Sequence, residues 1–291
     1  MPNKNSTPAL IAPQLADGLE IAESIRKKIV LNYSVIGFVL FAGLIIEAVT
    51  WMSIAVVIII LFVLVYTKWY GIPVSLFEKK FIERITNNTI QLIDPGLKVD
   101  FQSHLKLSEI NTFGLMPDNP DYFSGKNLIY GTIGEVPLQI SEIYAEWKED
   151  NRKIPAKSGI FNALEVIASN HLTDEGIIYL STHIEHLENK KLNLSDTTIK
   201  NNDSGIYYLS TNKNIEISNR LNTFFNYIQQ YHLASGKQVI CTLKPNFIEL
   251  AILNEKSFNY FEPSVFKTVY NNKAANTYYS DLSFLCKAVS L

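Results

Sequence analysis

Two long apolar runs lie close together near the N-terminus and dominate the hydrophobic pattern of the chain. Residues 29–46 and residues 51–66 each approach the roughly 20 apolar residues that a helix needs to cross a bilayer. One continuous helix over both runs would be about twice as long as the hydrocarbon core is thick. We therefore predict a two-helix transmembrane hairpin over residues 29–67, with its turn at Glu47–Thr50.

Basic residues flank the predicted hairpin on one side only. Arg26, Lys27 and Lys28 precede the first run, and the turn holds no basic residue. The second run is followed by Lys68, Lys79, Lys80 and Arg84. Because loops rich in Lys and Arg stay on the cytoplasmic side, the pattern predicts a multi-pass protein of the cell membrane with both termini in the cytoplasm.

Glu47 is the one acidic residue between the two runs, and two interpretations of it remain open. At a turn its carboxylate reaches water and needs no function. Buried in lipid it would be costly, which would indicate a proton relay or an ion-coordinating group. In the second case the chain would be a subunit of a transport or secretion assembly.

The segment before the first apolar run changes character near Gln14. Residues 1–13 are rich in Pro, Asn, Ser and Thr, which predicts a disordered tail. In residues 14–28 apolar side chains recur at helical spacing. We predict an amphipathic helix there, either as an extension of the first span or as a helix that binds a partner.

The remaining chain, residues 68–291, mixes helical and strand periodicity. A helix is predicted over Val74–Ile93, ended by the turn signal Asp94-Pro95-Gly96, and a short one over Leu105–Phe113. An amphipathic helix is predicted over Ser218–His232, ended at Ser235-Gly236. Strand periodicity covers residues 128–133, 136–147, 161–169, 176–181, 205–209, 238–243, 247–253 and 258–265.

This order of elements indicates the fold class. Neighbouring strands joined by short turns, with helices between groups of strands, favour an α+β region of mixed, mainly antiparallel strands over a parallel doubly wound sheet. The polar stretch Leu187–Ser204 is predicted to be a loop or a boundary between two subregions of the cytoplasmic part.

Composition adds limits on function. The chain has 19% charged residues, below the roughly 25% of a typical soluble domain, because the apolar runs carry almost none. Its net charge of -2 excludes a globally basic nucleic-acid binder. The two cysteines, Cys241 and Cys286, cannot form a disulfide framework, and Cys241 lies in an apolar strand pattern that predicts a core residue.

The densest group of potential metal ligands is His183, His186 and the glutamates beside them, Glu185 and Glu188. On a strand the two imidazoles would point to opposite faces, whereas on a helix their i, i+3 spacing would bring them together. The strand-like residues before them favour a solvated strand end. A membrane-anchored metal-dependent hydrolase is the alternative, but the H-E-x-x-H pattern is missing.

No other motif assigns chemistry. Gly131–Gly134 lacks the third glycine of a dinucleotide-binding loop and predicts a hairpin turn. We therefore assign no catalytic residue, metal ligand or cofactor. The aromatic-rich loop Phe113–Phe123, with Tyr122 and Phe123, is a candidate recognition surface because loops on a rigid scaffold often bind partners.

The leading hypothesis is an integral membrane protein with a cytoplasmic binding or scaffold module. Its partners would be the lipid bilayer and a protein partner, a second copy of the chain or a small ligand, and not nucleic acid.

The order of several short motifs resembles that of a known family. These motifs follow the two apolar runs and the predicted helix from Phe77 to Leu92. They are Phe113-Gly-Leu115, Asp121–Gly125, Gly131–Gly134, Ser141-Glu142, Ile160-Phe161 and Phe261–Phe266. Over roughly residues 30–270 the chain resembles the bacterial membrane proteins of domain-of-unknown-function family 3137. The resemblance implies a bacterial integral membrane protein whose cytoplasmic α+β region has no assigned reaction.

Overall fold

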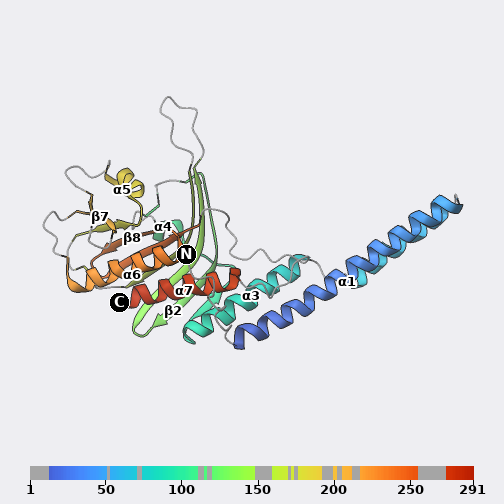
Figure 1. Ribbon diagram of the computed structural model, residues 1–291, viewed down its shortest axis with the longest axis horizontal. Helices are drawn as coiled ribbons and strands as arrows, with labels where there is room; N and C mark the ends of the chain where they lie inside the picture. Colours follow the sequence, from blue (N-terminus) through green and yellow to red (C-terminus); the bar gives the residue numbers. More distant parts are fainter. Residues whose placement is uncertain are drawn as a thin grey trace, which may run out of the picture. The chain divides into compact units, whose positions relative to one another are not determined.

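The chain divides into two compact units. The computed structural model describes residues 13–50, 53–70, 74–110, 115–116, 120–147, 159–169, 172–173, 176–191, 199–201, 205–211, 217–254 and 273–291. One unit comprises residues 1–92 and 261–276, and the other comprises residues 93–260 and 277–291. The first contains long helices (Figure 1), and the second contains the β-sheet.

Three helices and the first residues of α7 (Lys273–Ser290) make up the described part of the first unit. The three helices are α1 (Pro13–Thr50), α2 (Ser53–Tyr70) and α3 (Val74–Ile93). The helix predicted over residues 14–28 is part of α1, as an extension of the first apolar run, whereas the turn predicted at Glu47–Thr50 was wrong, because α1 is a single helix through Thr50. Pro13 suits the first helical position, and the change in polarity near residue 29 leaves the backbone hydrogen bonding of a helix unchanged. The predicted tail, apart from Pro13, lies outside the described residues.

One segment of α1 is long and apolar enough to cross a membrane. It runs from Leu19 to Ile45, has a mean hydropathy of 1.9, and is 11% buried within the structure. Its charged side chains all lie before Ile29. The predicted hairpin of two spans is therefore supported for one helix only, among the residues described. The second predicted span falls on α2, where the side chains of residues 53–59 lie outside the description.

The described side chains of α1 and α2 expose large apolar groups. The tyrosine hydroxyl of Tyr66 on α2 donates a hydrogen bond of 3.1 Å to the side-chain oxygen of Asn32 on α1, so the two helices lie side by side. The apolar side chains that remain exposed on them include Leu31, Phe38, Phe41, Leu44, Leu61, Phe62 and Leu64. Such a concentration is unusual for a surface in water and typical of one that faces lipid.

The second unit is built on one nine-stranded sheet in which every recorded pairing is antiparallel. The strand order is β1-β2-β3-β4-β9-β8-β5-β7-β6. The α+β fold class with mainly antiparallel strands is thereby confirmed. The strands are β1 (Lys98–Asp100), β2 (Tyr122–Ile133), β3 (Val136–Trp147), β4 (Gly159–Ser169), β5 (Ile178–Ser181), β6 (Lys200–Asn201), β7 (Tyr207–Ser210), β8 (Val239–Lys244) and β9 (Phe247–Leu253).

Each face of the sheet is packed against other elements. Helix α4 (Leu107–Ile110) packs on one side of the sheet, here called the α4 face. Leu105, just before this helix, and Ile110, within it, pack against Ile143 of β3 and Ala251 of β9 on that face. Because side chains alternate along a strand, the intervening residues point to the opposite side, the α6 face.

Helix α6 (Asn219–Ser235) covers that opposite side, where Phe225 contacts the ring of Tyr208 on β7 at 5.6 Å between centroids. The side-chain oxygen of Ser218 accepts from the backbone of Leu221, and Gly236 closes the helix in the left-handed conformation. The predicted helix with its glycine stop is confirmed.

Residues 277–290 of α7 (Lys273–Ser290) lie against α6 (Figure 1). The rings of Tyr231 and Phe284 stack at 3.8 Å between centroids. The buried carboxylate of Asp281 accepts a hydrogen bond of 2.5 Å from Tyr231 and pairs with Lys237. The sequence interpretation missed α7, although its buried side chains recur at helical spacing: Ala275, Tyr278, Leu282, Leu285 and Val289.

The polar stretch Leu187–Ser204 is not entirely a loop. Helix α5 (Ile184–Lys191) overlaps its start and β6 lies near its end. Strands from both sides of this stretch belong to the same sheet. The predicted strand at residues 258–265 lies outside the described residues.

Candidate functional site

An open groove of about 680 Å³ lies in the second unit, between α4 and four strands of the sheet. This volume falls within the range of pockets that hold small ligands. Ser108 and Glu109 of α4 line one side. The strands contribute Tyr130 and Thr132 of β2, Pro137 and Gln139 of β3, Ile167 and Ser169 of β4, and Phe247 of β9.

Local sequence features fix the positions of the segments that line the groove. The carboxylate of Glu109 accepts a hydrogen bond of 2.8 Å from the backbone nitrogen of Lys106, which caps the short helix α4. Gly134 adopts φ 59° in the turn between β2 and β3, as the sequence predicted for a hairpin. At Gly131 a side chain would meet the backbone oxygen of Gly96 at 2.8 Å, so only glycine lets the turn before β1 approach β2 this closely.

Two buried glutamates lie two residues along their strands from the groove lining. On β4, Glu165 precedes the lining residue Ile167 by two positions, and on β9, Glu249 follows the lining residue Phe247 by two. In the register of the sheet, Glu249 pairs with Ile167, so both carboxyl groups are on the α4 face as diagonal neighbours. Both residues are fully buried.

Burial controls the protonation of this pair. Within the described part of the chain neither oxygen of Glu165 makes a hydrogen bond of normal length and angle, although the Glu249 carboxyl is close enough to interact with it. Loss of hydration raises the pKa of Glu165 to about 7, and the interaction with Glu249 opposes the rise. The geometry suits one proton held between two carboxyl groups, and such a pair can accept a donor group or a cation.

Hydroxyl groups continue this polar row along the sheet. Thr242 of β8 pairs with Glu249 and with Tyr179 of β5, so the three share one face. Burial, followed by the charge of Glu249, raises the pKa of Tyr179. The Thr242 hydroxyl is buried and makes no hydrogen bond within the described part of the chain.

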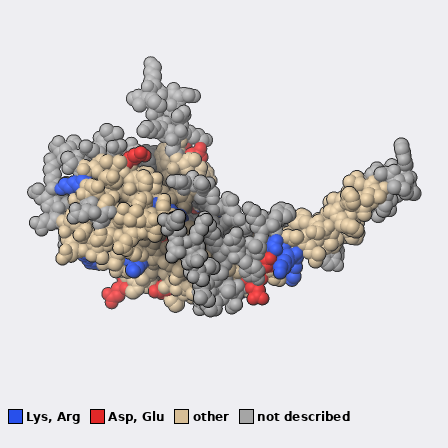
Figure 2. All heavy atoms as spheres, in the orientation of Figure 1, with Lys and Arg blue, Asp and Glu red and all other residues tan. Residues whose placement is uncertain are grey.

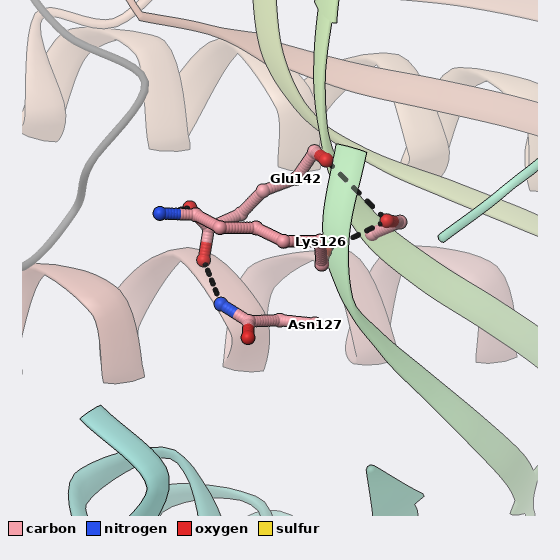
Figure 3. A network of polar contacts seen from close by, with 4 residues as sticks. Lys126, Asn127 and Glu142 are labelled. Atoms are coloured by element: carbon pink, nitrogen blue, oxygen red, sulfur yellow. Dashed lines mark hydrogen bonds and ion pairs between the residues drawn. The ribbon is translucent and has the colours of Figure 1, made fainter. Parts of the chain in front are cut away.

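A third buried glutamate, Glu142, lies on the α6 face with different neighbours (Figure 3). One carboxylate oxygen accepts a hydrogen bond of 2.7 Å from the side-chain amide of Asn127, and the other lies 3.5 Å from the Lys126 ammonium. A β-bulge between Lys126 and Ile129, with Asn127 at φ 57°, turns both side chains toward Glu142. Burial raises the pKa of Glu142, while Lys126 and Asn127 oppose the rise.

The histidines singled out by the sequence gather at a helix end. His183 precedes α5 and His186 lies in its first turn, so the predicted strand end was wrong: the chain turns into a helix after β5. His232 of α6 lies beside them. The ring centroids of His183 and His232 are 5.4 Å apart, and those of His183 and His186 are 6.4 Å apart.

These imidazoles are held by hydrogen bonds to neighbouring groups. The Nε2 atom of His186 is 2.8 Å from the amide oxygen of Gln238, and the Nδ1 atom of His232 is 2.7 Å from the backbone oxygen of Lys237. Among the described residues no group of three His, Cys, Asp or Glu side chains is placed to hold a metal ion. The metal-dependent hydrolase gains no support from this cluster.

The other singled-out residues lie apart from the groove lining. Tyr122 and Phe123 are the first residues of β2 and not part of a loop, and several residues of Phe113–Phe123 lie outside the description. The side chain of Glu47 is also outside it. Cys241 is buried in β8, and burial raises the pKa of its thiol well above the ordinary value, as expected for a core residue.

Sequence reasoning missed the groove, Glu165, Glu249 and His232. A charged residue at the centre of an apolar strand pattern, as in Phe161–Ser169 and Phe247–Leu253, was a usable signal for the two glutamates. Their proximity depends on the pairing of β4 with β9, which the order of the strands along the chain does not reveal.

Comparisons with known proteins add no relative. No family model, no curated protein and no solved structure matches this chain. The resemblance to family 3137 therefore stays a prediction.

Proposed function

We propose that this chain is a multi-pass integral membrane protein with both termini in the cytoplasm, and that its α+β unit is a binding module. The groove of this unit takes a small neutral or cationic ligand. The observation that carries the ligand assignment is the buried Glu165–Glu249 pair next to the groove lining on β4 and β9.

Charge supports a neutral or cationic ligand over an anion. Glu109 is the one formally charged side chain among the described groove residues. The buried carboxyl pair behind it would repel a second anion and attract a cation or a hydrogen-bond donor. The rings of Tyr130 and Phe247 add flat apolar surface, and Gln139 and Ser169 add polar contacts, a combination typical of ligand sites.

The apolar helix supports the membrane assignment. From Ile29 to Thr50, α1 would extend about 33 Å, close to the thickness of the hydrocarbon core. The hydrogen bond from Tyr66 to Asn32 supports α2 as the second helix of a hairpin. Basic residues lie before the apolar part of α1 and after the apolar part of α2. They support the placement of both termini in the cytoplasm.

The ligand assignment is tested on the full-length protein in detergent. A panel of small aromatic amines, amides and carboxylic acids is screened by the shift in thermal unfolding temperature. We expect amines or amides to raise the unfolding temperature and carboxylic acids to have no effect. Ser169→Trp, which fills the groove, should abolish the shift, whereas Asn222→Trp on the exposed surface of α6 should preserve it. Shifts that survive in Ser169→Trp would contradict the proposal.

The membrane assignment needs a separate experiment. Washing vesicles with alkaline carbonate should leave the full-length protein in the membrane pellet. Protease added outside intact cells should leave the α+β unit uncut. Release by carbonate, or digestion from outside, would overturn the membrane part and leave the ligand assignment standing.

A further inference from the structure

A second groove lies in the helical unit, between α1 and α3. Its volume is about 570 Å³. Apolar side chains line one part of it, Ile21 and Ile25 from α1 and Phe77 from α3. Polar side chains of α3 line the other part: Lys80, Glu83, Arg84, Asn87 and Asn88. The lining is therefore amphiphilic, like the headgroup and the first carbons of a phospholipid.

The charge balance at this groove favours an anion. The two acidic side chains beside the groove already have basic partners: Glu23 pairs with Arg26 at 2.6 Å and Glu83 with Lys79 at 3.8 Å. Lys80 and Arg84 are exposed and form no ion pair within the described part of the chain. They are left as the uncompensated charges of the lining.

The spacing of these two cations also favours a bound anion. Lys80 and Arg84 are four residues apart on α3, which places them next to each other on one side of the helix. Like charges at this spacing destabilise a helix, and an anion between them reverses that effect. A phosphate group has the charge and the oxygen acceptors for both side chains, and Asn87 can donate a further hydrogen bond.

The position of the groove along α1 indicates a lipid as the source of the phosphate. Ile25 and Ile21 precede the start of the apolar run at Ile29 by four and eight residues, or about 6–12 Å along the helix. This is the depth of the headgroup layer when Ile29 enters the hydrocarbon core. Figure 2 shows basic side chains gathered on α1 where its uncharged part begins, and the sequence there reads Arg26-Lys27-Lys28.

We propose that the groove between α1 and α3 binds the phosphate headgroup of an anionic phospholipid, held by Lys80 and Arg84. The proposal rests on the membrane assignment made above. The groove also holds the apolar side chains of Ile21, Ile25 and Phe77, which the acyl carbons of a lipid can contact and which a free phosphate ion would not need.

The test uses the full-length protein in detergent and soluble short-chain lipids. Binding of dioctanoyl phosphatidylglycerol, dioctanoyl phosphatidylcholine and inorganic phosphate is measured by microscale thermophoresis. Phosphatidylglycerol should bind most tightly and more weakly at high salt. In the double variant Lys80→Gln/Arg84→Gln its affinity should fall about 30-fold, since each basic residue near a membrane surface contributes roughly 1 kcal/mol, which is about fivefold in affinity.

The control is Lys98→Gln/Lys200→Gln, which removes the same charge from exposed strand residues of the other unit and should leave the affinity unchanged. Equal binding of the two lipids by the wild type, or unchanged phosphatidylglycerol binding in the Lys80/Arg84 variant, would overturn the proposal. Inorganic phosphate binding as tightly as phosphatidylglycerol would overturn the lipid source. If carbonate released the protein but the lipid preference and its loss in the variant persisted, the membrane assignment would fail and the headgroup site would stand.

Discussion

The two faces of the sheet bury glutamates in opposite ways. On the α6 face, Glu142 has a lysine ammonium at 3.5 Å and an amide donor at 2.7 Å. On the α4 face, Glu165 has another carboxyl group, that of Glu249, as its interacting neighbour. Burial raises the pKa of both glutamates, but only at Glu142 do a cation and an amide oppose this rise.

The difference separates a structural role from a functional one. A buried carboxylate with a cation and a hydrogen-bond donor is a closed network, and it holds the β2 bulge against β3. Two buried carboxyl groups side by side disfavour each other's charge, which costs stability unless a proton or a ligand compensates. Their position two residues from the lining of an open groove is what favours ligand binding.

The largest contrast is expected from removing one carboxyl group on each face. Glu142→Leu should lower the free energy of unfolding by about 3–5 kcal/mol, because Lys126 and Asn127 lose their buried acceptor. Glu165→Gln should change it by less than about 1 kcal/mol above pH 7, since an uncharged amide replaces a poorly compensated charge. Hydrogen exchange of β3 and β4 amides in the full-length protein measures both.

Equal losses in the two variants would remove the distinction between the two faces. Tyr122→Phe provides a control on the same sheet: its side chain is exposed, so exchange should stay at the wild-type level.

A smaller effect is expected from pH. The folded protein holds the Glu165 proton more tightly than the unfolded chain does, with a pKa of about 7 against an ordinary value of 4.5. This contribution to stability is complete below about pH 4.5 and is lost as the pH rises to about 7. The loss should reach at most about 3 kcal/mol, observed as faster exchange of β4 and β9 amides after correction for intrinsic rates.

Glu165→Gln separates this titration from others in the protein. The variant should lose the part of the change in stability between pH 4.5 and 7 that Glu165 contributes, while Glu142→Gln should retain that part. A bound cationic ligand should reduce the dependence in the wild type, because it stabilises the ionised pair.

Strong local periodicity made part of the fold predictable from sequence. The helix Val74–Ile93 and the strand Val136–Trp147 begin and end where the pattern indicated. In both, apolar residues alternate with polar ones at one constant period and turn residues mark an end. Where a polar residue ends an apolar run without breaking the helix, as at Glu47 in α1, the same reasoning placed a turn that does not exist.

The candidate site was hidden for a different reason. Glu165 and Glu249 meet because β9 returns to pair with β4, and His232 joins His183 because α6 ends near the start of α5. Such contacts depend on long-range pairing, which local periodicity does not encode. The sequence does mark each glutamate as an unusual residue within an apolar strand, but not its partner.

The smallest expected effect isolates the amide donor of the Glu142 network. Asn127→Ala removes the hydrogen bond and places alanine at φ 57°, where a side chain that cannot bond to its own backbone is strained. Asn127→Gly removes the same hydrogen bond without that strain. We expect the free energy of unfolding to fall by about 2 kcal/mol for alanine and by about 1 kcal/mol for glycine, measured by exchange of β2 and β3 amides.

The difference between the variants gives the cost of the bulge conformation, and the glycine value gives the contribution of the amide. If glycine were as stable as the wild type, Lys126 alone would compensate Glu142, and the contrast between the two faces would rest on a single ion pair.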